Sequence, residues 1–130
     1  MELEVKHLAP YLPYSLKIQY IVRDKVEKTG YMRSISHNED ETHPTRVSIN
    51  HNYEEHIWMF KPILRPMEDI KYYVEFLNKY NVDFDKKEGC LVKRKNENYT
   101  RLNELDFLFQ NHFDVFGLIP KGLAVDINTL

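Results

Sequence analysis

Polar and apolar residues alternate along residues 14–22, and this is the clearest pattern in the chain. One face collects apolar side chains and the other polar ones: Tyr14, Leu16, Ile18, Tyr20 and Val22 against Ser15, Lys17 and Gln19. An alternation with period two predicts a half-buried strand. A turn at residues 23–25 leads into a second strand pattern at residues 26–36, with Gly30 as a bend. The two segments therefore predict a β-hairpin.

Two further strands are predicted at residues 45–50 and 56–64. They follow a polar, acidic loop at residues 37–44, and a short turn at residues 50–52 joins them. Four antiparallel strands connected by short turns are typical of a small curled sheet or an SH3-like barrel.

The pattern changes from strand to helix at Pro62 and Pro66. Proline donates no ladder hydrogen bond but is tolerated in the first turn of a helix. Apolar residues then recur three or four apart, which predicts helices at residues 67–80 and 102–116, with Gly117 as the left-handed cap of the second. A short extended segment is expected at residues 123–127.

The expected fold class is therefore α+β: a small antiparallel four-stranded sheet or SH3-like barrel followed by two helices. A chain of 130 residues has room for one compact core. We expect one domain over residues 1–130, with a β part at residues 14–64 and a helical part at residues 66–130.

Charge and composition narrow the classes of partner. The formal net charge is -2, and the segment up to Pro66 holds nine basic and nine acidic residues. A binder of duplex DNA is usually clearly basic, so duplex DNA is not expected as a partner. No apolar run is long enough for a membrane span or reads as a signal peptide, and the single cysteine, Cys90, has no internal partner. A cytoplasmic location in the cell that makes the protein, without membrane association, is the expectation.

Motifs for catalysis are absent from the sequence: it holds no Gly-rich phosphate loop, no His-Glu-x-x-His and no Gly-x-Ser-x-Gly. The spacings of His37 from His43 and of His51 from His56 match no standard set of metal ligands, so no metal and no cofactor are expected. Asp114 or Asp126 is expected to accept hydrogen bonds from backbone donors in the last turn rather than to act in catalysis.

Aromatic residues next to cations form the candidate binding site. The groups are Tyr31 with Arg33, Trp58 and Phe60 with Lys61 and Arg65, and Tyr99 with Arg101. Stacking on a ring combined with a cation for a phosphate is how proteins bind nucleotides and single strands. The alternative is that these aromatics belong to the core and its rim. Arg65, between two prolines, is the best single candidate, and its alternative role is to hold the strand-to-helix corner by donating to backbone carbonyls.

Three blocks of sequence carry a family resemblance. They are residues 61–70 (KPILRPMEDI), 112–119 (HFDVFGLI) and 121–128 (KGLAVDIN), and the opening LAPYLPY at residues 8–14 adds to them. Together they resemble a family of small uncharacterised proteins encoded by phages and prophages of Bacteroides-type bacteria. The family has no assigned activity, so the resemblance implies no functional residues.

The resemblance implies a phage accessory protein, located in the cytoplasm of the host bacterial cell. The first hypothesis is a non-enzymatic binder, as a monomer or a homo-oligomer, that counters host defence by sequestering a nucleotide-derived immune signal or by blocking a host defence protein. The second is a single-stranded nucleic-acid-binding or replication accessory protein. The third is a structural protein of the virion.

Overall fold

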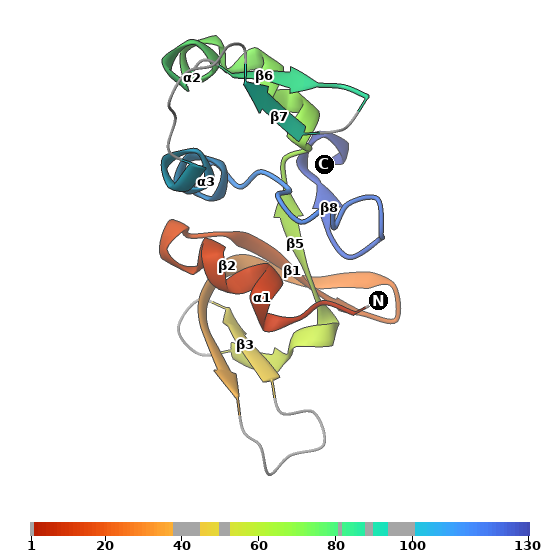
Figure 1. Ribbon diagram of the computed structural model, residues 1–130. Helices are drawn as coiled ribbons and strands as arrows, with labels where there is room; N and C mark the ends of the chain where they lie inside the picture. Colours follow the sequence, from red (N-terminus) through yellow and green to blue (C-terminus); the bar gives the residue numbers. More distant parts are fainter. Residues whose placement is uncertain (1, 38–44, 50–52, 81, 88–89, 94–100) are drawn as a thin grey trace.

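A six-stranded sheet forms one part of the molecule, and helices with a separate two-stranded hairpin form the other (Figure 1). The computed structural model describes residues 2–37, 45–49, 53–80, 82–87, 90–93 and 101–130. The strand order in the large sheet is β4-β3-β2-β1-β5-β8. All its neighbours are antiparallel except β5 and β8. Its strands are β1 (Lys17–Val22), β2 (Lys25–His37), β3 (Thr45–Ile49), β4 (Tyr53–His56), β5 (Phe60–Leu64) and β8 (Val125–Asp126).

The predicted hairpin is confirmed in β1 and β2. Ile18 lies opposite Gly30 in the register, and Lys17 lies opposite Tyr31. The α-helix α1 (Val5–Leu8) and the 3₁₀ helix η1 (Ala9–Tyr14) precede β1 and pack on the face of the sheet that carries Ile18. The prediction that the first strand begins at residue 14 was wrong, because η1 ends there and Ser15 adopts a left-handed conformation with φ 53°.

The first core cluster fills the space between these helices and the sheet. Members with no exposed surface come from both layers and from the turn that precedes β8: Leu8, Tyr11, Leu16, Ile18, Val47, Leu64 and Leu118. Burial of such side chains from water supplies about 1.5–3 kcal/mol each before the loss of entropy is counted. Leu16, Ile18 and Tyr20 of the alternating segment belong to this core.

The predicted strand at residues 56–64 is divided in the structure. The 3₁₀ helix η2 (Ile57–Met59) separates β4 from β5. Ile57 is buried while Trp58 is exposed, so the turn places one apolar side chain in the core and the next one in solvent. An uninterrupted apolar run does not distinguish a buried strand from a short helical turn.

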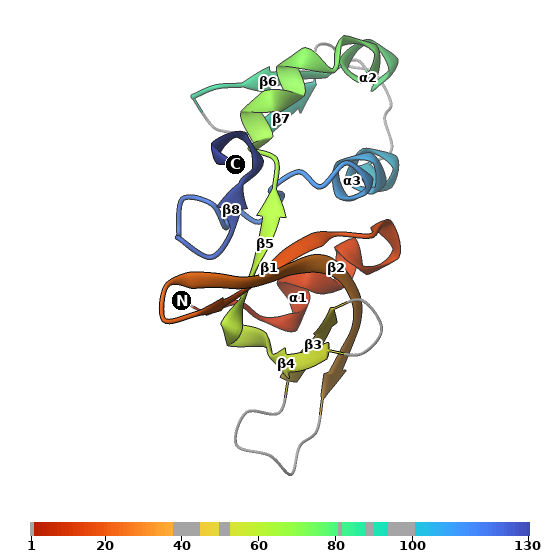
Figure 2. The ribbon, with the colours of Figure 1, turned by 180° about the vertical axis from the view of Figure 1, so that it is seen from behind.

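The second part of the molecule lies beyond the end of β5. It contains the 3₁₀ helix η3 (Met67–Tyr72), the helices α2 (Val74–Tyr80) and α3 (Arg101–Gln110), and the hairpin of β6 (Val82–Asp85) with β7 (Cys90–Lys93). The 3₁₀ helix η4 (Ile127–Thr129) ends the chain. A second core cluster joins η3, α2, β6 and α3: Ile70, Phe76, Leu77, Val82, Leu108 and Phe113. In both views α3 lies between the sheet and the layer of α2 with the hairpin (Figures 1 and 2).

The α+β class is confirmed, but the predicted arrangement was wrong. The sheet has six strands, not four, and in the described residues its order runs openly from β4 to β8 rather than closing into an SH3-like barrel. The part expected to be helical, residues 66–130, contributes β8 to the large sheet and forms the hairpin β6–β7. The predicted extended segment at residues 123–127 is confirmed in β8.

The last predicted helix ends earlier than its apolar pattern indicates. The N–H of His112 donates to the carbonyl of Phe109, and that of Phe113 donates to the carbonyl of Leu108. With His112 at φ 60°, these bonds form a Schellman motif, which ends α3 at Gln110. Gly117 has the expected left-handed conformation, with φ 69°, but it lies in the following turn and caps no helix.

Candidate functional site

An aromatic cavity lies between α2 and α3. Phe76 of α2 and Phe107 of α3 stack with their ring centroids 4.0 Å apart and their planes 15° apart. Tyr73, the residue between η3 and α2, meets Phe107 edge to face at 5.8 Å. Offset stacks and edge-to-face contacts are the preferred geometries of aromatic pairs, so these rings form a defined wall.

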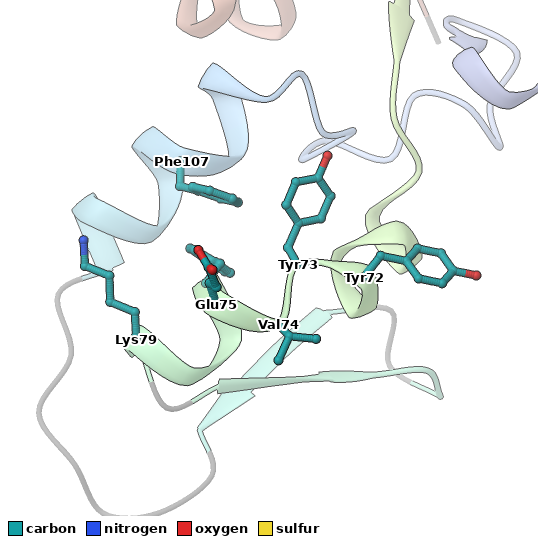
Figure 3. A pocket seen from close by; sticks show the side chains of 7 residues that line it. Tyr72, Tyr73, Val74, Glu75, Lys79 and Phe107 are labelled. Atoms are coloured by element: carbon teal, nitrogen blue, oxygen red, sulfur yellow. The ribbon is translucent and has the colours of Figure 1, made fainter.

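The cavity has a volume of about 520 Å³, within the range of small-molecule sites. Its lining combines rings with two charged side chains: Tyr72, Tyr73, Val74, Glu75, Phe76, Lys79 and Phe107. Figure 3 shows Phe107 reaching from α3 toward α2, with Tyr73 upright beside it and Tyr72 turned away. Glu75 and Lys79 are exposed on the same helix. The cavity thus offers flat apolar walls and one charge of each sign.

Arg65 lies directly after β5 and contacts the aromatic cluster from the other side of Tyr73. Its guanidinium carbon is 6.0 Å from the ring centroid of Tyr73 and 6.0 Å from that of Phe113. These distances are at the limit for cation–π attraction. Tyr73 therefore contacts both the cavity and Arg65, a predicted site residue whose side chain is among those that the structure describes.

The backbone of Arg65 is held at both ends. Its N–H donates to the carbonyl of His112 at 2.8 Å, and its carbonyl accepts the N–H of Asp114 at 2.8 Å. The main chain of Arg65 thus holds the strand-to-helix corner. The alternative to ligand binding predicted that its side chain would do so. Nε of Arg65 is buried and has no hydrogen-bond partner among the described residues.

The other predicted site residues lie elsewhere. Trp58, in η2, is 55% exposed and stacks on His56 with ring centroids 6.3 Å apart. Met59 and the five residues of β5 separate it from Arg65, and the strand alone has a length of about 16 Å at about 3.3 Å per residue. Trp58 and Arg65 therefore lie at opposite ends of β5, and the binding role of Trp58 stays a prediction.

Tyr31 and Lys61 share the outer face of the large sheet. The cross-strand pairs Lys17 with Tyr31 and Gln19 with Lys61 place all four side chains on the face opposite Ile18. The ammonium of Lys17 lies 6.0 Å from the Tyr31 ring centroid. Arg33 is exposed at an irregularity in the pairing of β2 with β3. In Figure 2 no helix lies in front of β1 and β2.

Asp114 supports the corner near Arg65. Its carboxylate, only 4% exposed, accepts the backbone N–H of Leu118 at 2.7 Å and that of Ile119 at 2.9 Å. Asp126 accepts the N–H of Asn128 at 2.9 Å. The predicted structural role of these two acids is confirmed.

Sequence reasoning missed the cavity itself. Phe76 and Phe107 follow helical apolar patterns, and such patterns indicate core positions without distinguishing a filled interface from one that leaves a cavity. The available signal was the high density of aromatics at residues 72–76 and 107–116. The pair Tyr99 with Arg101 cannot be placed, because Tyr99 and the side chain of Arg101 lie outside the described residues.

The described part of the chain holds no group of three or more His, Cys, Asp or Glu side chains that could bind a metal ion. His43 and His51 lie outside that part. Among the described helices, none is both long enough and apolar enough to cross a membrane. Comparisons with protein-family models, with curated proteins and with solved structures found no match to this chain.

Proposed function

We propose that this protein is a non-enzymatic binder that takes a planar, nucleotide-derived small molecule in the aromatic cavity. The observation that carries the proposal is the cavity of about 520 Å³ with Phe76, Phe107 and Tyr73 in its wall. Stacking of a base on an aromatic side chain is worth about 1–3 kcal/mol and tolerates any base. The proposal moves the ring-binding site from Trp58 to α2 and α3.

The biological role follows from the family resemblance. In a phage accessory protein, tight binding of a nucleotide-derived immune signal would lower its free concentration and so counter the host's defence. This role, the cytoplasmic location and the homo-oligomer stay predictions. Block of a host defence protein and a structural role in the virion are the alternatives that the same origin allows.

Calorimetry with a matched pair of variants tests the site. Phe107→Leu removes a ring from the cavity wall, whereas Phe84→Leu removes a similarly half-buried ring of the second core cluster that does not line the cavity. We expect nucleosides or nucleotides to bind the wild type. Phe107→Leu should weaken this binding about tenfold or more and Phe84→Leu should leave it unchanged, because only Phe107 can stack with the ligand.

Three results would contradict the proposal. They are the absence of binding of any nucleoside or nucleotide to the wild type, equal effects of the two substitutions, and full affinity in Phe107→Leu. Native mass spectrometry of protein purified from infected cells would report a retained small molecule and the stoichiometry together.

A second candidate function, binding of single-stranded nucleic acid, is favoured by the outer sheet face. Lys17 next to Tyr31, with Lys61 on the same face, combines cations with an exposed ring. If this face binds a labelled oligonucleotide, Lys17→Gln with Lys61→Gln should weaken binding and reduce its salt dependence, because two phosphate contacts are lost. Lys86→Gln, in the turn after β6, is the control. Fluorescence anisotropy without any signal for the wild type removes this candidate.

A further inference from the structure

The two charged side chains of the cavity lining come from one face of α2. Glu75 and Lys79 are four residues apart in this helix, and both line the cavity. Side chains with this spacing are neighbours on a helix surface, with their Cβ atoms about 5–6 Å apart. Both are exposed, and the described structure contains no ion pair between them. The helix thus presents a hydrogen-bond acceptor and a hydrogen-bond donor side by side at the cavity.

These charges lie next to the aromatic wall. Phe76, the residue after Glu75, is buried and stacks on Phe107. In the view of Figure 3, Glu75 lies between Lys79 and Tyr73, below the ring of Phe107. Because the rings and the charges line the same cavity, a flat ligand that stacks on the rings brings its polar edge to the charges.

Among the common bases, guanine has the edge that matches these two charges best. A carboxylate only accepts hydrogen bonds, and guanine presents two adjacent donors, N1–H and the 2-amino group, to its two oxygens. Adenine and cytosine present one amino donor next to an unprotonated ring nitrogen, which repels the second oxygen. Uracil presents one N–H between two carbonyl groups. An ammonium only donates, and O6 and N7 of guanine are acceptors for lysine.

We infer that the cavity selects guanine among the bases, with Glu75 accepting hydrogen bonds from N1–H and the 2-amino group and Lys79 donating to O6 and N7. The two donors and the two acceptors follow one another along one edge of the base, as the two side chains follow one another along α2. This inference rests on the proposed function and adds the identity of the base to it. It requires no phosphate, so a nucleoside is a sufficient probe.

Matched nucleosides and matched variants test the role of Glu75. We would titrate the wild type with guanosine, inosine, adenosine, cytidine and uridine by calorimetry. Guanosine should bind about tenfold tighter than inosine, which lacks only the 2-amino group, because a hydrogen bond to a charged acceptor is lost. Glu75→Met should abolish this difference. Glu68→Met, which replaces an exposed glutamate of η3 that does not line the cavity, should retain it.

The ligand 7-deazaguanosine tests the role of Lys79, because a C–H group replaces the acceptor N7 in it. It should bind the wild type about three- to tenfold more weakly than guanosine does. Lys79→Met should abolish this difference, whereas Lys86→Met, in the exposed turn after β6, should retain it.

The outcomes separate this inference from the proposed function. Equal affinity of the wild type for guanosine and inosine overturns the selection of guanine, and so does an unchanged difference in Glu75→Met; binding of other nucleosides then leaves the cavity as a ring-binding site. Equal affinity for guanosine and 7-deazaguanosine, or an unchanged difference in Lys79→Met, overturns the role of Lys79. No binding of any nucleoside or nucleotide overturns the proposed function as well. The comparison of guanosine with inosine in the wild type decides the inference even if a variant does not fold.

Discussion

At the scale of single residues, the amino-acid type of a buried polar group limits its role but does not determine it. The expectation that Asp114 or Asp126 bonds to backbone donors was correct because each acid precedes unpaired N–H groups in a turn. The condition of Arg65 was not predictable, since whether an arginine finds an acid depends on contacts between distant segments. The same holds for His7, which is 2% exposed although its neighbours Lys6 and Glu4 are exposed.

His7 leads to a prediction about pH. Nδ1 of its ring accepts the backbone N–H of Glu4 at 2.9 Å, which requires this nitrogen to be unprotonated. Burial lowers the pKa of His7 below its ordinary value of 6.5, with smaller contributions from Lys6 and Lys121, while Glu4 acts in the opposite direction. The unfolded chain therefore takes up the proton more readily than the folded one. The contribution of neutral His7 to the free energy of unfolding should be fully present above pH 6.5, the ordinary pKa. It should be lost as the pH falls through that value toward the lower pKa of the folded state.

Urea unfolding at several values between about pH 8 and about pH 5 measures this effect. His7→Asn removes the titrating group while keeping a side-chain oxygen that can accept the N–H of Glu4. The difference between wild type and variant should shrink or reverse on acidification. A difference that stays constant across this range would show that protonation of His7 does not oppose folding.

At the scale of elements, the hairpin of β1 and β2 was predictable and the helical part was not. In a sheet with one buried face, apolar and polar residues alternate along a strand, and Leu16, Ile18 and Tyr20 are the buried apolar positions of this alternation. Gln19, on the opposite face, is buried too, which the alternation did not indicate. The helix expected at residues 67–80 is interrupted at Tyr73, which has φ -98° and ψ 64° and places its ring between Phe107 and Phe113. The hairpin β6–β7 was missed because its strands have four residues each and lie among charged ones.

The helix α3 shows why an apolar pattern alone misplaces an end. Leu108 packs in the second core cluster and Phe109 against the first, so the helix is apolar on two sides. The pattern continues through Phe113 and Phe116, which are beyond the helix. A histidine, not a glycine, occupies the left-handed capping position, and Nε2 of His112 contacts the carbonyl of Tyr14 at 2.7 Å. This tertiary contact stabilises a histidine at a capping position where glycine is the usual residue, so the sequence does not mark the end of the helix.

Two substitutions at His112 separate the cap from this contact. Both His112→Ala and His112→Gly lose the interaction with Tyr14, but only alanine must adopt the strained left-handed conformation. Such strain costs about 1–2 kcal/mol in a residue with a Cβ, and the larger entropy loss of glycine offsets part of it. We therefore expect His112→Gly to be the more stable variant by about 1 kcal/mol in urea unfolding. Equal stabilities would contradict the assignment of His112 as the cap.

At the scale of the whole molecule, two core clusters share a few connecting contacts. Phe113 belongs to the cluster of α2 and α3, and its backbone bridges to Arg65 at the end of β5. The hydroxyl of Tyr11, fully buried in the sheet cluster, donates to the carbonyl of Phe113, and burial raises the Tyr11 pKa so that this hydroxyl stays protonated. These contacts join the sheet cluster to the cluster that contains the aromatic wall of the cavity.

Tyr11→Phe tests how strongly the clusters are coupled. The substitution leaves the packing of the ring against Phe109. It removes the bond that the hydroxyl donates to Phe113 and the one that it accepts from the N–H of Val115 at 3.3 Å. We expect a loss of about 1–2 kcal/mol in the free energy of unfolding, because Val115 N–H still donates to the same carbonyl at 2.9 Å.

Fluorescence of Trp58, the single tryptophan, reports on the sheet, and far-ultraviolet circular dichroism reports on the helices as well. Coincident transitions by the two probes in wild type and variant indicate one cooperative unit. Separate transitions in the wild type would show that each cluster unfolds by itself, and a variant as stable as the wild type would show that the Tyr11 hydroxyl does not join them.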